Sequence, residues 1–178
     1  MARFELKHAG LSQLDQLACD TLVLWVFADQ RPLRGLAGFV DWRLNGRLSA
    51  LLKDDFFDGM RHEQMMTVTG GRIGVNRVVA MGAGFLRDLD LTAFSDLVDH
   101  TCQCLQRLKA PSAALSIPGW NREDQVYEDQ HEMKLGIILD RLVMALDAPV
   151  TLFLPDGISL KEFQVTLNRI EQKLKRHG

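Results

Sequence analysis

The sequence contains few cysteines and no large excess of either positive or negative charge. Each of these absences excludes whole classes of protein. Its three cysteines, Cys19, Cys102 and Cys104, are too few and too unevenly spaced for a disulfide framework. Lys plus Arg (21) nearly balance Asp plus Glu (23), and the net charge of −2 gives no general attraction to nucleic acid or to anionic lipid. We therefore expect a reduced, cytoplasmic setting and no nucleic-acid partner.

Long hydrophobic runs and catalytic signatures are missing as well. No apolar run approaches the ~20 residues that span a bilayer, and residues 1–8 alternate apolar with charged side chains, unlike a signal peptide. The chain has no Gly-x-Ser-x-Gly, no His-Glu-x-x-His and no phosphate-loop Gly-Lys-Ser/Thr. The sequence thus gives no positive signal for an enzyme, and we expect no membrane contact and no cofactor.

What the sequence does contain is an alternation of strand and helix patterns over its whole length. Apolar or alternating runs predict strands, and apolar residues at helical spacing predict helices between them. The pattern predicts a single domain, residues 1–178, of the α/β class, with a mixed, largely parallel sheet flanked by helices in three layers. The expected strands are 3–8 (at an edge or half-exposed), 20–29 (central), 64–69, 77–81, 112–117 and 149–154. The expected helices are 36–53 (broken at Gly46), 91–108, 133–146 and 159–176.

The stretch from Arg77 to Phe85 is the most informative of these. Four consecutive apolar residues follow Arg77 without alternation, which predicts a strand covered on both faces. Gly82, Ala83 and Gly84 then predict a sharp turn at the strand end. This turn is either structural or a contact for an anion or nucleotide through its backbone amides. The dinucleotide fingerprint is incomplete, because Arg87 stands where its third glycine belongs.

A second candidate binding segment ends another strand. Ser116, Gly119 and Trp120 follow residues 112–115, and ligands of open α/β sheets bind beyond such strand ends.

Residues 121–132 are acidic and predict a solvated loop. The alternative is a hard-cation site, but the spacing matches no calcium loop. His100, Cys102 and Cys104 are close in sequence, as metal ligands often are. On a helix, however, the side chain of Cys102 points away from that of His100. We expect buried thiols and no metal ligands.

The last helix carries a narrow apolar seam with steps of three and four residues. Docking of this seam on the sheet and a contact with a second subunit or a partner protein are both open. The seam residues are Leu160, Phe163, Leu167, Ile170 and Leu174.

Three segments in this order resemble the N-terminal domain of the leucine aminopeptidase (cytosol aminopeptidase) family. Residues 20–27 look like that domain's early strand of Asp plus hydrophobic residues. Residues 46–59, with Gly46, Leu48, Leu51-Leu52, Asp55-Phe56 and Gly59, are similar to its "G-x-L-x-x-L-L … D-F-x-G" segment. Residues 77–84 look like its "R-V-L-L-V-G-L-G" strand and turn. The likeness covers most of residues 20–120.

The resemblance implies a macro-domain-like α/β fold and, at the same time, no peptidase chemistry. In the family a separate C-terminal domain holds the two-metal site, and we expect this chain to stop where the linker to that half would begin. The metal-binding "N-T-D-A-E-G-R" signature is absent, so no metal ligand or catalytic lysine is carried over. We expect a stand-alone, non-catalytic module that acts in binding or assembly. Two alternatives are a macro-like protein that binds or hydrolyses ADP-ribose or a related nucleotide, and an interaction subunit for a separately encoded partner.

Overall fold

The computed structural model describes residues 3–117, 131–154 and 159–177, and its elements follow the predicted alternation. Every predicted strand and helix forms, with ends that differ by a few residues. The strands are β1 (Arg3–His8), β2 (Cys19–Phe27), β3 (Gln64–Val68), β4 (Val75–Gly84), β5 (Ala113–Ser116) and β6 (Pro149–Leu154). The helices are α1 (Leu11–Asp15), α2 (Gly35–Arg43), α3 (Arg47–Lys53), α4 (Leu91–Arg107), α5 (His131–Ala145) and α6 (Leu160–His177), with a short 3₁₀ turn at Leu86–Asp88.

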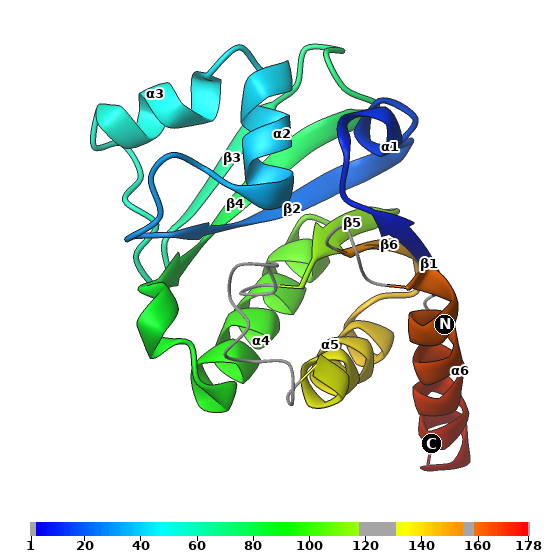
Figure 1. Cartoon of the computed structure of the whole chain (residues 1–178). Helices are drawn as coiled ribbons and strands as arrows, with labels where there is room; N and C mark the ends of the chain where they lie inside the picture. The colour runs from blue at the N-terminus through cyan, green and yellow to red at the C-terminus, as the bar shows by residue number, and fades with distance from the viewer. Residues whose placement is uncertain (1–2, 118–130, 155–158, 178) are drawn as a thin grey trace.

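The six strands form one sheet in the order β1-β6-β5-β2-β4-β3 (Figure 1). All neighbouring strands pair in parallel except β3 and β4, which are antiparallel. The mixed, largely parallel α/β class is therefore confirmed. The predicted positions of β1 at an edge and of β2 near the centre are confirmed too, because β2 lies between β5 and β4.

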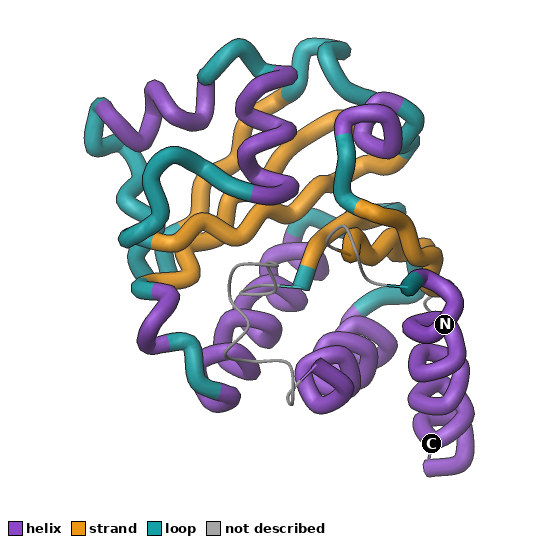
Figure 2. Tube along the Cα trace, viewed as in Figure 1, coloured by secondary structure: helices purple, strands orange, loops and turns teal. Residues whose placement is uncertain are grey.

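Helices cover both faces of this sheet and make three layers. Helices α1, α2 and α3 lie on one side, and α4, α5 and α6 lie on the other (Figures 1 and 2). Strand β4 contributes to both cores, with Val78 and Ala80 facing α2 and α3 and with Val79 and Met81 facing α4. The predicted coverage of β4 on both faces is confirmed. Within the described part of the chain, no helix has the length and apolar character that crossing a membrane requires.

Strand β4 continues through Gly84, so the predicted strand end at Met81 and turn at Gly82–Gly84 are wrong. The segment that leads into β3 runs beside these residues and extends the pairing. The Gly82 amide donates to Glu63 O, and the Gly84 amide donates to Gly59 O, both at 2.9 Å. On the other side Val26 pairs with Gly82 and Phe27 with Gly84, so Ala83 is the extra residue of a bulge.

The helix ends follow their sequence signals. The Asp90 carboxylate accepts the Ala93 amide at 2.8 Å and begins α4, and the Ser159 hydroxyl accepts the Glu162 amide at 3.3 Å at the start of α6. Helix α5 begins at His131, two residues earlier than predicted. The rest of the predicted acidic loop, together with Gly119 and Trp120, lies outside the described residues.

The seam of α6 packs inside the molecule. Phe163, Leu167 and Ile170 belong to the core shared with α4 and α5, and Leu160 packs against it. The side chain of Leu174 lies outside the described part. These contacts agree with docking on the sheet, whereas a subunit or partner contact through this helix stays a prediction.

Candidate functional site

The described residues of the two predicted binding segments lie at the ends of β4 and β5, the two strands that flank β2. Gly84 ends β4 and Ser116 ends β5, and β2 runs between them. Because all three strands are parallel, their carboxyl ends share one edge of the sheet. The fold therefore brings the described part of both segments to the same edge, and binding of a ligand by Gly82, Ala83, Gly84 or Ser116 stays a prediction.

The chain itself already occupies the backbone groups at this edge. Besides the two glycine amides, the Gly84 carbonyl accepts the Ala28 amide at 2.8 Å. A Cβ atom on Gly82 would lie only 1.9 Å from Met60 O, so the crossing segment 59–61 fills the space beside the glycines. The Ser116 carbonyl accepts the indole N–H of the buried Trp25 at 2.6 Å. These glycines thus allow two backbones to approach closely.

Two charged residues in the loops at this edge tie segments together. The Arg31 guanidinium donates to Phe27 O at 2.7 Å and to Asp58 O at 3.1 Å. The Asp29 carboxylate accepts the Leu86 amide at 3.0 Å. Neither residue is part of a recognisable sequence motif, because no local pattern shows which carbonyl or amide a loop side chain will reach.

Asp20 and Arg77 are the first residues of the segments 20–27 and 77–84, and they meet near the amino ends of β2 and β4. Asp20 and Arg77 form an ion pair at 2.6 Å, and both side chains are largely buried. Thr21 and Asn76 also donate to the Asp20 carboxylate, at 2.7 and 3.0 Å. Partial burial acts to raise the pKa of Asp20, but hydrogen bonds from Asn76, Thr21 and Arg77 outweigh it and the pKa lies below its ordinary value.

Gly59, the glycine that ends the segment 46–59, also has a structural role. Its φ of +79° is unfavourable for residues with a side chain, and a Cβ atom there would lie 2.9 Å from Val26 O. Gly59 therefore lets the segment before β3 cross closely over the end of β2. The motif residues described here hold backbone and strands in place and form no reactive group.

The cysteine thiols and histidine imidazoles are the side chains that a zinc-type metal ion would favour. Cys102 is buried as predicted, whereas Cys104 is only partly buried. Burial raises the pKa of Cys19 and of Cys102 to about 12. Burial lowers the pKa of His100, and the nearby His62 adds to this effect. Among the described residues, no group of three or more His, Cys, Asp or Glu side chains is arranged to hold a metal ion.

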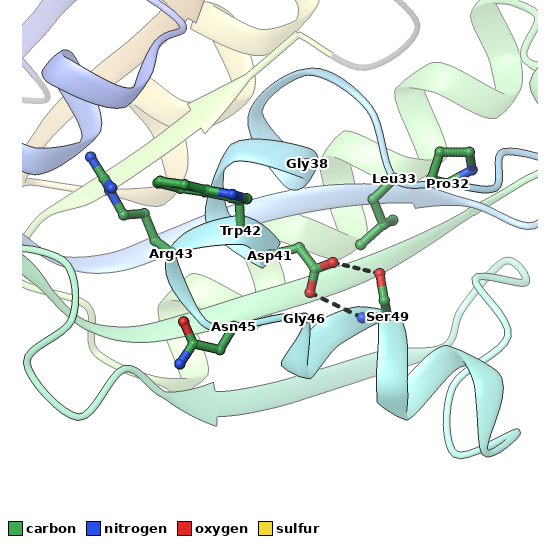
Figure 3. A pocket seen from close by; sticks show the side chains of 9 residues that line it. All are labelled: Pro32, Leu33, Gly38, Asp41, Trp42, Arg43, Asn45, Gly46 and Ser49. Atoms are coloured by element: carbon green, nitrogen blue, oxygen red, sulfur yellow. Dashed lines mark hydrogen bonds between the residues drawn. The ribbon is translucent and has the colours of Figure 1, made fainter.

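Sequence reasoning missed a depression beside α2. Its volume is about 570 Å³, and it lies between α2 and α3 (Figure 3). The Asp41 carboxylate of α2 accepts the Leu48 and Ser49 amides of α3 at 2.8 and 3.0 Å and so fixes the two helices. The lining residues are Pro32, Leu33, Gly38, Asp41, Trp42, Arg43, Asn45, Gly46 and Ser49.

An exposed aromatic side chain borders this depression. Trp42 is 63% exposed, and the Arg43 guanidinium lies 4.8 Å from the centre of its ring. A second depression of about 400 Å³ shares Leu33, Gly38 and Trp42 and is also lined by Phe39. The spacing of Phe39 and Trp42, three residues apart on one helix, was the available sequence signal.

The architecture is that of macrodomain-like α/β proteins. An Oceanobacillus iheyensis macrodomain mutant with ADPR superposes with a TM-score of 0.65 at 9% identity, covering 97% of this chain and 94% of that one. A tomato leucine aminopeptidase mutant superposes with a TM-score of 0.63 at 14% identity, covering 98% of this chain and 36% of that one. At these identities the likeness establishes the fold alone.

The sequence comparison gives the family. Residues 23–140 match the model of the cytosol aminopeptidase family, N-terminal domain, and the chain belongs to this family. A probable cytosol aminopeptidase of Cupriavidus metallidurans is 30% identical over 109 residues, which cover 61% of this chain. The match spans only 21% of that relative's own length. The resemblance to the N-terminal domain of this family is thereby confirmed.

Proposed function

We propose that this chain is a non-catalytic member of the cytosol aminopeptidase family that acts in binding or assembly. The observation that carries the proposal is the structural use of the family motifs. Asp20 and Arg77 join two strands, and Gly59 and Gly82 allow close backbone approach. These four residues thus hold the fold together, and this structural use of the motifs supports a role in binding or assembly rather than in catalysis. A cytoplasmic location fits the proposal, since three free thiols suit a reducing compartment.

An amidase assay tests the non-catalytic part of the proposal. We expect no release of chromophore from a leucine p-nitroanilide when the pure protein is incubated with Mn²⁺ or Zn²⁺. A cytosol aminopeptidase that contains both family domains, assayed in parallel, should turn over the substrate. Turnover by this chain that requires metal and disappears with a chelator would contradict the proposal.

A second candidate function is binding of ADP-ribose or a related nucleotide. The observation that favours it is the macrodomain architecture over nearly the whole chain, in a comparison with a macrodomain mutant that has ADPR bound. Ser116 lies at the carboxyl edge of the parallel strands, where ligands of open α/β sheets bind. This candidate rests on fold analogy more than on any described polar group.

Calorimetry with ADP-ribose tests this second candidate. If the nucleotide binds beside β5, we expect a saturable heat that Ser116→Asp weakens at least tenfold, because the added carboxylate repels the diphosphate. Gln106→Glu is the control, because Gln106 is exposed near the end of α4, which leads to the amino end of β5, and its replacement should leave the affinity unchanged. The absence of heat at millimolar ADP-ribose, or an equal effect of both variants, would count against nucleotide binding at this edge.

A further inference from the structure

The two edges of the sheet carry different residues. The outer strand β1 places Arg3, Glu5 and Lys7 along its length, and charged side chains on an edge strand discourage pairing with other chains. The opposite edge strand, β3, has the sequence Gln-Met-Met-Thr-Val, without a charge or a proline. One edge of this sheet is thus protected against pairing and the other is not.

The backbone of β3 offers hydrogen-bonding groups on its outer side. Glu63 O accepts the Gly82 amide and the Thr69 amide donates to Asn76 O, so the odd-numbered residues of this segment face β4. In an antiparallel pair the direction of these groups alternates with each residue. The N–H and C=O groups of Gln64, Met66 and Val68 therefore point away from the sheet, where the described part of the chain places no further strand.

The side chains of the same residues are exposed. Met66 is 54% exposed and Val68 is 65% exposed, whereas Met65 of the same strand is buried in the core that contains residues of α2 and α3. Two apolar side chains thus accompany a row of outward-facing backbone groups. Exposed apolar edges of this kind pair with another strand.

We propose that β3 pairs antiparallel with β3 of a second copy of this chain, about a two-fold axis that passes through Met66. The partner is a second copy because antiparallel pairing of two identical strands is self-complementary, as a two-fold interface requires. In this register Met66 lies opposite Met66 of the other copy, and Gln64 lies opposite Val68. All three outward-facing residues are used, which gives about six hydrogen bonds across the interface.

The charge pattern agrees with this register. No charged side chain lies within the five residues of either strand, so like charges do not meet across the axis. Glu63, just outside the strand, lies opposite the neutral Thr69 of the other copy. An interface this small gives a weak dimer, which forms at protein concentrations of about 100 µM rather than at nanomolar concentrations.

Sedimentation equilibrium over a concentration series measures the dimer directly. We expect a reversible monomer–dimer equilibrium for the natural sequence and a loss of at least tenfold in association for Met66→Lys, which sets two ammonium groups opposite each other. Val165→Lys is the matched control, because Val165 is as exposed as Val68 but lies on α6, and it should leave the dimer intact. A monomer at every concentration, or equal effects of both substitutions, would overturn the proposal.

A cross-link keeps the test decisive if Met66→Lys fails to fold. In a hydrogen-bonded antiparallel pair the Cα atoms of opposite residues lie about 5.5 Å apart, a separation that a disulfide spans. Met66→Cys should therefore form a disulfide-linked dimer under mild oxidation, whereas Val165→Cys should not. Failure of Met66→Cys to cross-link would contradict the proposal. The inference builds on the proposed role in assembly, but a monomer without amidase activity would overturn only the pairing of β3.

Discussion

Replacing Gly82 with alanine is expected to lower the free energy of unfolding by about 3 kcal/mol or more. The added Cβ atom would lie 1.9 Å from Met60 O and 2.9 Å from backbone carbons of Gly59 and Met60. None of these atoms belongs to a flexible side chain, so the crossing segment or β4 has to move. That movement disturbs the bonds from the Gly82 and Gly84 amides. Urea denaturation followed by far-ultraviolet circular dichroism measures the loss.

Gly136→Ala provides the control for Gly82→Ala. Gly136 lies in α5, and a Cβ atom there would meet nothing within 4 Å. Alanine is preferred over glycine inside a helix by about 1 kcal/mol, so this variant should be more stable than the natural sequence. If Gly82→Ala and Gly136→Ala both changed the stability by less than 1 kcal/mol, the close approach at Gly82 would not constrain the fold.

Removing the Arg77 guanidinium is expected to destabilise the protein by about 2 kcal/mol. Arg77→Ala leaves the Asp20 carboxylate largely buried without its cation, and it also removes donors to Thr21 Oγ1 and to Leu108 O. The estimate is below that for a fully buried pair, since both side chains keep some contact with solvent. Thermal and urea unfolding at pH 7 measure the effect.

The control for Arg77→Ala is Arg141→Ala. The Arg141 guanidinium pairs with Asp99 at 2.9 Å, but both side chains are about half exposed. Exposed pairs contribute little, so this variant should change stability by less than about 0.5 kcal/mol. Equal losses in the two variants would show that burial of the Asp20–Arg77 pair does not matter.

The pH dependence gives a second readout for the Asp20–Arg77 pair. The pKa of Asp20 in the folded protein lies below its ordinary value of 3.8, so the folded state favours the ionised form. Its contribution to stability is complete above pH 3.8 and is lost as the pH falls through the lower folded pKa. In Arg77→Ala, the free energy of unfolding should fall less on acidification than in the natural sequence. In Arg141→Ala, the fall should be the same as in the natural sequence.

Sequence patterns do not predict which segments of the chain contact one another at the candidate site. The glycines of Gly82–Gly84 indicated that something approaches the backbone closely, but not that the chain's own segment 59–63 does so. The depression beside Trp42 depends on how α3 packs against α2. The Asp41 carboxylate fixes this packing by accepting the amide of Leu48, seven residues further along the chain. Such contacts depend on where segments meet in space, and local periodicity carries no information about that.

The sequence by itself determined the class and the family. Strand and helix periodicity reports which side chains leave water, and that pattern predicts the alternating elements and the coverage of β4 on both faces. Only contacts in the folded chain establish what Gly59, Gly82 and the Asp20–Arg77 pair do. Their roles arise from contacts between residues up to 57 positions apart, such as the bond from Arg77 to Asp20, and a pairing of that range leaves no local pattern in the sequence.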